Sequence, residues 1–461
     1  MYVAKLLLQH QSLHLINGVR ILWRWDSGTA SWQYATADSQ LRNALETVLP
    51  NLSSFTELMP GEGFWVQASQ SVQIATDRWS DRAADFTIVK VDGPQLPRAM
   101  MSHHFREFDD NVTILFGGHG SEFRSLSSIV TIDRATGSVT EQSMNYVHDA
   151  PVFVQLDTNG MRYLIAGGNS DLGVPAVAGA EIYDYTTRTL TPTGSLNLFR
   201  ASAGASKTAS GKVLVAGGWY NHNNAHTVAE IYDPATGLFT TTGSLVEPRA
   251  DPIVLPANGG AVVIGGIHYT TAAPIESVEF YNESEGSFST LSQTILPGES
   301  GWYVHGGLNR RSFESMLMRD GSGRFIFKAD RAGTKEQALI VFDPATKQMS
   351  KLPIALPKSD DLYLYEVHNV GNIPNTIVLL GSEAGSYPAG QRVRIVKINL
   401  ATGAVTLSNS VTLPQNYDIS QASHTWLNDG TGFLIAGGTV GQGYDYNFQP
   451  VATTFYLKFQ P

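Results

Sequence analysis

The sequence predicts an all-β protein, a seven-bladed β-propeller that follows a small N-terminal α+β module. Two features that recur along its 461 residues predict the propeller. The first is an apolar run that ends in a glycine pair or a close variant. It recurs about every 50 residues, which is the spacing of a radial array of blades. These runs are Ile114–Gly118, Leu164–Gly168, Val213–Gly218, Val262–Gly266, Val378–Ser382 and Leu434–Gly438.

The second recurring feature is an apolar run that ends in a turn opened by Asp or Asn. Such a side chain bonds the backbone of its own turn, and a following Pro or Gly supplies the dihedral angles that the turn needs. Each turn is therefore predicted to join two outer strands of a blade. We expect structural roles for four turn aspartates and one neighbouring tyrosine: Asp133, Asp184, Asp233, Asp343 and Tyr232.

The number of blades follows from the weaker copies. The stretch between Asn282 and Asp343 has room for one additional blade, whose second strand is predicted at Phe325–Lys328 without a glycine pair. The seven second strands then end near residues 118, 168, 218, 266, 328, 382 and 438. Because the last copy stops after its third strand, Thr453–Leu457, we expect residues 85–91 to pair with it and close the ring.

These markers resemble those of bacterial kelch-repeat propellers. The resemblance is carried by the glycine pairs, by the segment Glu230–Gly237, and by the Phe199-Arg200 and Pro248-Arg249 steps into the next blade. It covers residues 83–461 and implies that the repeated Gly, Tyr and Asp residues build the blades. Galactose oxidases carry similar propellers, but their cofactor needs a Cys crosslinked to Tyr, and this chain has no Cys. We expect no cofactor.

The first residues do not share the repeat. Ile21–Asp26 and Ser31–Tyr34 predict a hairpin, and the apolar spacing over Ser39–Leu49 predicts a helix. The segment Pro60–Val66 resembles the end of a small β-rich module appended to secreted bacterial proteins. That resemblance implies packing roles for Trp23, Trp25, Trp32 and Trp65, with glycan stacking as the alternative. The predicted domains are 1–78, a linker at 79–84, and the propeller at 85–461.

Composition and charge narrow the classes of partner. The net charge of −10 disfavours a nucleic-acid or anionic-membrane binder. Polar residues interrupt the apolar run in Met1–Ile16, so this segment predicts neither a signal peptide nor a membrane span. The low charged fraction of 16% and the module resemblance favour an extracellular or cell-surface location, and the protein could belong to a larger surface assembly.

Function in a propeller lies on its loops. The loops after the glycine pairs and the crossings between blades are predicted to share one face. A ring of cationic or titratable groups there would attract an anionic ligand, such as an acidic glycan or an acidic protein. In the alternative, Arg200 and Arg249 are framework residues paired with carboxylates. The candidate ligand-binding residues are Arg98, His119, His148, Arg200, Trp219, Tyr220, His222, Arg249, His268 and Tyr269.

The loop Gly217–His226 is the strongest candidate within this face. His222 and His226 lie in an Asn-rich loop without an acidic residue between them, which disfavours a metal site. Aromatic and amide side chains on one loop suit contact with a sugar or a peptide. No nucleophile elbow, phosphate loop or calcium loop occurs in the sequence.

Two classes of function are consistent with these residues. The favoured one is a non-catalytic binding or adhesion propeller. The other is a polysaccharide lyase that cleaves a uronate-containing glycan by β-elimination. That reaction needs a carboxylate neutraliser, a base and an acid, for which the candidates are Arg200, Arg249, His119, His222 and Tyr220.

Overall fold

The computed structural model divides the chain into two compact units, Met1–Arg82 and Ala83–Pro461. In the first unit it describes the strands and residues 79 and 82. From residue 83 on, it describes every residue except 122–123, 171–175, 222–223, 269, 305–315, 319, 371–372, 374, 385–390, 442–448 and 461. Among the described residues, no helix has the length and apolar character needed to cross a membrane.

The described part of the first unit is built from strands. The hairpin predicted in this region is present, since β3 pairs with β4 and Trp25 lies opposite Trp32. The helix predicted at 39–49 lies outside the described residues. The larger sheet has the order β1-β7-β3-β4-β5, and β2 pairs with β6. The strands are β1 (Lys5–Leu7), β2 (Gln11–Ser12), β3 (Val19–Asp26), β4 (Ser31–Ala35), β5 (Ser53–Ser54), β6 (Glu57–Leu58) and β7 (Gly63–Ala68).

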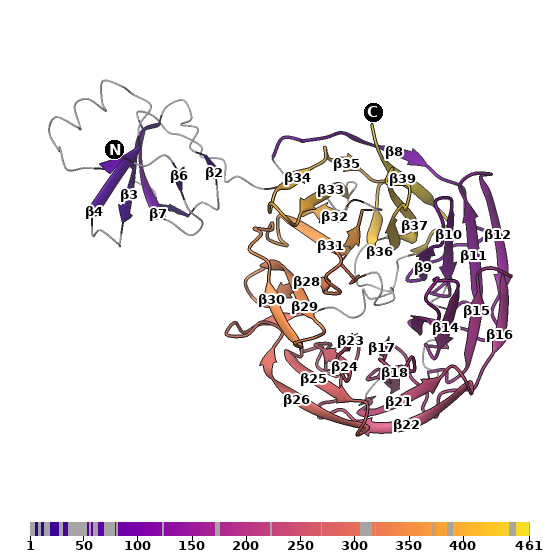
Figure 1. Ribbon diagram of the computed structural model, residues 1–461. Coiled ribbons are helices and arrows are strands. Elements are labelled where there is room, and N and C mark those ends of the chain that lie inside the picture. Colours follow the sequence, from indigo (N-terminus) through magenta and orange to yellow (C-terminus); the bar gives the residue numbers. More distant parts are fainter. Residues whose placement is uncertain are drawn as a thin grey trace. The chain divides into compact units, whose positions relative to one another are not determined.

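The second unit is a seven-bladed β-propeller, as the repeat predicts. Figure 1 shows its sheets arranged in a ring. The first blades in chain order are blade 1, of β9 (His104–Glu107), β10 (Val112–Phe116), β11 (Ser128–Asp133) and β12 (Ser138–Ser143), and blade 2, of β13 (Val152–Gln155), β14 (Arg162–Ala166), β15 (Ala180–Asp184) and β16 (Thr189–Pro192).

Blades 3 and 4 repeat this antiparallel pattern. Blade 3 also carries a two-stranded hairpin, β19 (Trp219–Asn221) with β20 (Asn224–Ala225). The strands of blade 3 are β17 (Gly204–Lys207), β18 (Val213–Ala216), β21 (Val228–Asp233) and β22 (Leu238–Ser244), and those of blade 4 are β23 (Ile253–Ala257), β24 (Gly260–Ile264), β25 (Ser277–Asn282) and β26 (Ser287–Thr294).

Blades 5 and 6 depart from the pattern at their inner strands and edges. The innermost strand of blade 5, β27 (Trp302–Tyr303), has only two residues. Its other strands are β28 (Phe325–Arg331), β29 (Gln337–Asp343) and β30 (Gln348–Lys351). Blade 6 has β31 (Leu362–Asn369), β32 (Thr376–Glu383), β33 (Arg392–Asn399) and β34 (Val405–Leu407), with β35 (Val411–Thr412) also paired to β33.

Blade 7 joins the two ends of the propeller. It contains β36 (Tyr417–Trp426), β37 (Gly432–Val440) and β39 (Thr454–Phe459), with β38 (Gln449–Pro450) paired to β37. Its outermost strand is β8 (Ile88–Asp92), from the region predicted to close the ring, and it pairs antiparallel with β39. In Figure 1 the indigo β8 lies beside the yellow β39. Asn409 of blade 6 bonds both the N–H and the carbonyl of Ile88, so the closing strand is tied to two blades.

The turns on the opposite face from the glycine pairs have the predicted geometry. The Oδ1 atoms of Asp133, Asp184 and Asp343 each accept two backbone N–H groups of their own turns. Tyr232 is buried, and its hydroxyl bonds Thr193 of the preceding blade over 2.8 Å. The structural roles expected for these residues therefore agree with their contacts.

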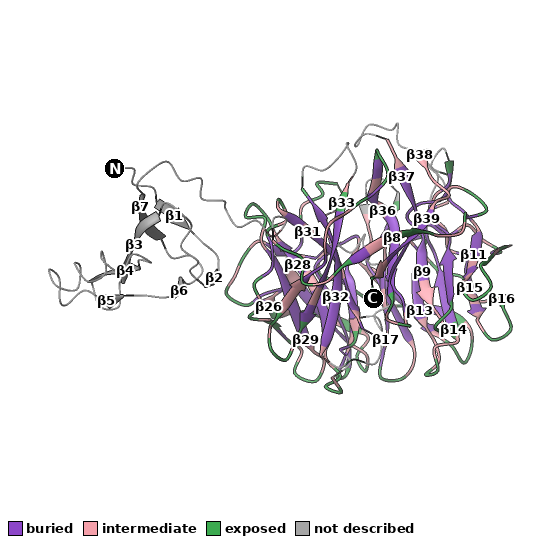
Figure 2. Ribbon diagram, turned by 90° about the horizontal axis from the view of Figure 1, so that it is seen from above, coloured by how far each residue is buried: buried purple, intermediate pink, exposed green. Residues whose placement is uncertain are grey.

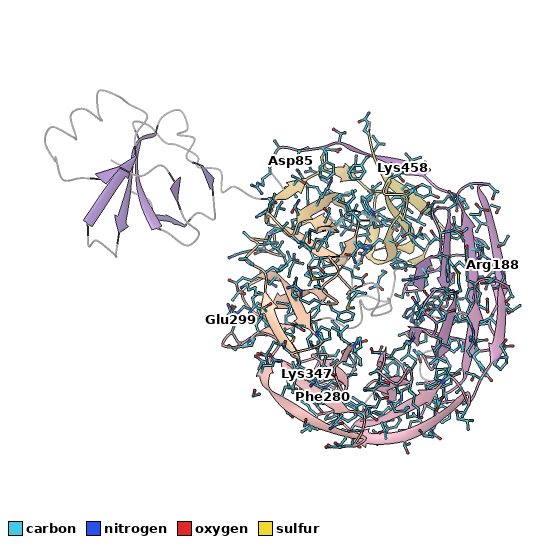
Figure 3. All side chains as sticks on the ribbon, in the orientation of Figure 1. Asp85, Arg188, Phe280, Glu299, Lys347 and Lys458 are labelled. Atoms are coloured by element: carbon cyan, nitrogen blue, oxygen red, sulfur yellow. The ribbon has the colours of Figure 1, made fainter. Side chains whose placement is uncertain are left out.

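The core lies between neighbouring blades. Figure 2 shows buried strands with the exposed residues gathered at the turns. One cluster joins blades 4 and 5 through Ile264, Trp302 and Phe342. At the rim of the same pair of blades, Lys347 lies 4.3 Å above the ring of Phe280, and both are labelled in Figure 3.

Candidate functional site

The glycine pairs and the crossings between blades meet on one face, here called the loop face. The crossing segments are residues 96–102, 144–150, 196–202 and 245–251. The second glycine of a pair donates its N–H to a carbonyl of the next crossing, as in Gly168 to Arg200 (2.8 Å) and Gly218 to Arg249 (2.9 Å). A Cβ on Gly217 would lie 2.6 Å from the carbonyl oxygen of Arg249, so only glycine fits this close approach.

In blades 1 to 4, the residue after the glycine pair is held by the crossing beside it. Isolated bridges join Met101 to His119, Asp149 to Asn169, Ala201 to Trp219 and Ala250 to Ile267. The loop face is therefore built from paired backbone segments, and this pairing fixes the position of the backbone from which each loop continues. This regularity brings His119, Trp219 and the crossing residues to equivalent places in successive blades.

Arg200 and Arg249 are buried framework residues in this structure. The guanidinium of Arg200 donates to Glu230 (3.0 Å) and to the carbonyl of Gly217 (2.9 Å). Arg249 bonds Glu279 (2.7 Å) and the carbonyl of Gly265 (2.9 Å) in the same way. All four side chains of the two ion pairs are fully buried, so neither arginine can reach a ligand. The ligand-binding role given to these two residues is therefore replaced by the framework alternative.

His148 occupies the equivalent position in blade 2. Its ring lies 3.2 Å from Glu181 and 2.5 Å from the carbonyl oxygen of Gly167, and its side chain is also fully buried. Burial alone would raise the pKa of Glu181, but the bonds from His148 and Asn145 outweigh that effect and lower it. His148 therefore also serves the framework, contrary to its predicted place in a ligand-binding ring.

Arg98 does not occupy the position of Arg200. Met100 does, since its carbonyl accepts the N–H of Gly438 as that of Arg200 accepts the N–H of Gly168. Val130 stands where blades 2 to 4 carry the buried glutamate, and Met100 and Val130 belong to one apolar cluster. Arg98 lies two residues earlier, half exposed, and bonds Glu141 over 2.7 Å.

Carboxylates also neighbour the other described histidines of the predicted ring. His119 lies 2.8 Å from Asp149, and His268 lies 3.1 Å from Glu247. His222 and Tyr269 fall outside the described residues. Wherever the structure describes them, the candidate arginines and histidines on this face are thus buried, paired with carboxylates, or both.

An uncharged aromatic cluster remains exposed on the loop face. Phe199 is 55% exposed and Tyr220 is 37% exposed, whereas Trp219 is buried at 8%. His226 joins the two exposed residues, because its ring lies 4.8 Å from that of Tyr220 and its Nε2 bonds the carbonyl of Phe199 over 2.9 Å. Burial is the largest of the effects that lower the pKa of His226, which favours the neutral imidazole. We call Phe199, Tyr220 and His226 the aromatic patch.

Sequence reasoning found Tyr220 but missed Phe199 and the three buried glutamates. A signal for the glutamates was present, since each stands two residues before the Tyr of a Tyr-Asp or Tyr-Asn step: Glu181, Glu230 and Glu279. The described residues contain no group of three or more His, Asp or Glu side chains arranged to hold a metal ion.

Comparison with known proteins supports the fold. No protein-family model matches the sequence, and no curated protein matches it either. A solved structure of a fungal alcohol oxidase in complex with copper is similar, with a TM-score of 0.55 and 16% sequence identity. The similarity covers 82% of this chain and 77% of the oxidase chain. At this level of identity it shows the propeller fold alone.

Proposed function

We propose that this chain is a kelch-type propeller that acts as a non-catalytic binding protein outside the cell, with a glycan as its ligand. The observation that carries the proposal is the aromatic patch on the loop face. There the exposed ring of Tyr220 lies 4.8 Å from an imidazole that also bonds the backbone of exposed Phe199, and the backbone beneath is fixed by buried ion pairs. A sugar presents an apolar ring face and polar edges, which aromatic side chains with hydrogen-bonding neighbours accommodate.

The charge of the ligand is expected to matter little to its affinity. Arg98, His148, Arg200 and Arg249 were among the groups that predicted an anionic ligand, and each of these four pairs with a carboxylate. The lyase alternative depends on the same arginines, and neither Arg200 nor Arg249 can approach a substrate carboxylate from its buried position. A protein partner would be a second outcome of the experiment below.

Screening on an array of neutral and acidic glycans, followed by calorimetry on the best ligand, tests the proposal. Tyr220→Ala and Phe199→Ala should each weaken binding about tenfold, because each removes part of the stacking surface. Leu238→Ala is the matched control, since Leu238 is 58% exposed but follows a turn on the opposite face. Binding should change little when the salt concentration rises well above physiological.

Three results would contradict the proposal. They are the absence of glycan binding, the loss of binding in Leu238→Ala but not in the patch variants, and the release of unsaturated uronate from acidic glycans. The last would restore the lyase, and capture of a protein ligand by the intact patch would change the class of partner.

A further inference from the structure

The crossing into blade 2 carries a histidine where the crossings into blades 3 and 4 carry arginine. The three residues make the same two contacts, one with a buried glutamate on the third strand of the blade and one with a glycine carbonyl at the end of the second strand. An arginine satisfies both acceptors at any pH near neutral, because its guanidinium keeps its proton. A histidine satisfies both only in some protonation states.

The hydrogen bonds of His148 define how many protons this site needs. The carbonyl of Gly167 can only accept, so Nδ1 of His148 carries a hydrogen. Nε2 faces Oε1 of Glu181, and a bond there requires one more proton, on either atom. A neutral imidazole opposite an ionised carboxylate would place two acceptors against each other in a fully buried site, which is unfavourable.

The groups around this pair do not replace the missing proton. Glu181 comes from β15, and its Oε2 accepts the backbone N–H and the side-chain amide of Asn145. The ring of Tyr146 lies 6.1 Å from that of His148, edge to face. The next residue, Asp149, contacts His119 over 2.8 Å. Two histidine–carboxylate contacts therefore anchor the same crossing segment, residues 144–150.

We propose that this crossing segment is a pH-sensitive latch. It is held while the buried His148–Glu181 pair shares a proton, and it loosens when that proton leaves as the pH rises. A histidine can release a proton that an arginine keeps, so the latch is specific to this crossing. The matching segments of blades 3 and 4, 196–202 and 245–251, are held by arginine and stay closed. Loosening would free Asp149 from its place on the loop face.

At acidic pH the latch weakens for a different reason, as the pH falls instead of rising. The folded protein lowers the pKa of Glu181, so the carboxylate contributes stability above its ordinary value of 4.5, and that contribution is lost as the pH falls through the lowered value. The latch is therefore closed between two limits, one set by protonation of Glu181 and the other by loss of the shared proton.

Hydrogen–deuterium exchange, corrected for intrinsic rates, tests the latch on the full chain at about pH 6 and pH 8.5. In the unaltered protein, protection in 144–150 should fall at least tenfold at the higher pH, while 196–202 and 245–251 should change little. His148→Arg should abolish the fall. Arg200→His should create the same fall in 196–202.

Because there are two substitutions, His148→Arg and Arg200→His, the proposal can still be tested when one of the variants fails to fold. An equal loss of protection in all three segments would overturn the latch, because it would indicate general loosening. A fall that persists in His148→Arg would also overturn it, and so would a folded Arg200→His protein that shows no pH response. These outcomes do not depend on ligand binding, so they are independent of the proposed function.

Discussion

Blades 2 to 4 and blades 5 and 6 hold the same architecture with different buried polar contacts. In blades 2 to 4, a glutamate on the third strand binds a histidine or arginine and backbone N–H groups of its own crossing segment, as Glu230 binds Arg200 and the N–H groups of Asn197 and Leu198. Blade 5 lacks the glycine pair and has a two-residue inner strand. The difference shows that the sequence repeat specifies one set of buried polar contacts in blades 2 to 4. Blades 5 and 6, where the repeat is degenerate, use other contacts instead.

Blade 5 uses an ion pair on its second strand. Nζ of Lys328 lies 2.8 Å from both carboxylate oxygens of Asp330 and 3.2 Å from Oε1 of Gln337. The ammonium also lies 4.3 Å above the ring of Tyr363, which belongs to blade 6. Burial lowers the pKa of Lys328, and Asp330 opposes that effect. These contacts join blades 5 and 6 where the inner strand of blade 5 is short.

Blade 6 shows a third solution. Nε of Arg394 bonds Glu383 over 2.7 Å, and Nη1 of Arg394 bonds the carbonyl of Ser408. Glu383 and Arg394 are on neighbouring strands, β32 and β33. Glu383 also accepts a hydrogen bond from Ser410, which lies between β34 and β35. The buried ion pairs thus include a crossing residue in blades 2 to 4, whereas in blades 5 and 6 both partners are on strands.

The largest expected effect tests the replacement in blade 5. Lys328→Met leaves Asp330 buried without its cation, so we expect the free energy of unfolding to fall by about 3–5 kcal/mol in urea titrations. Lys212→Met is the control, because its ion pair with Asp233 is exposed to solvent and should contribute far less. Equal losses in the two variants would show that Lys328 has no special role.

A smaller effect is expected in the turns, which the strong and weak blades share. Bonds from the N–H of Ala235 and from Lys212 lower the pKa of Asp233. Ionised Asp233 therefore stabilises the fold above its ordinary pKa of 3.8, and this contribution is lost as the pH falls through the lowered value. Blades 4 and 6 carry Asn282 and Asn399 at this position.

Asp233→Asn should keep the turn, because the amide oxygen still accepts from the backbone, and it should reduce the acid sensitivity of the melting temperature. Asp233→Ala should lower the melting temperature at every pH at which the carboxylate is ionised. Melting curves measured between neutral and acidic pH distinguish the two variants. If both behave alike, the bonds of this carboxylate do not stabilise the turn.

The fold was largely predictable from the sequence because its repeat lies in turn and glycine chemistry. The glycine pairs, the Asp turns and the lost pair of blade 5 predicted seven blades and the region that closes the ring. The site was less predictable. Pro97-Arg98 has the same sequence as Pro248-Arg249, but it lies two residues earlier in its crossing. The backbone bond from Gly438 shows that Met100 occupies the position of the arginine.

The burial of Arg200 and Arg249 could not be predicted from the sequence either. A cation in a loop of an acidic protein suggests a ligand, whereas Arg200 and Arg249 are inside the blades because Glu230 and Glu279, from distant strands, meet them there. Phe199 was recognised only as a step into the next blade. Phe199 and Tyr220 are linked through His226, which bonds the carbonyl of Phe199 and lies against the ring of Tyr220, and local sequence does not specify these contacts.

A double-mutant cycle on Arg249 and Glu279 tests most directly whether the crossing cations serve the framework. Blade 1 provides the template, since Met100 and Val130 occupy these positions in an apolar cluster. Arg249→Met alone leaves buried Glu279 without its cation. Adding Glu279→Val should restore at least half of the lost stability, with a coupling energy of about 2 kcal/mol in urea unfolding, and should leave glycan binding at the aromatic patch intact. Additive losses in the double variant, or loss of binding by a folded Arg249→Met protein of unchanged stability, would contradict the account.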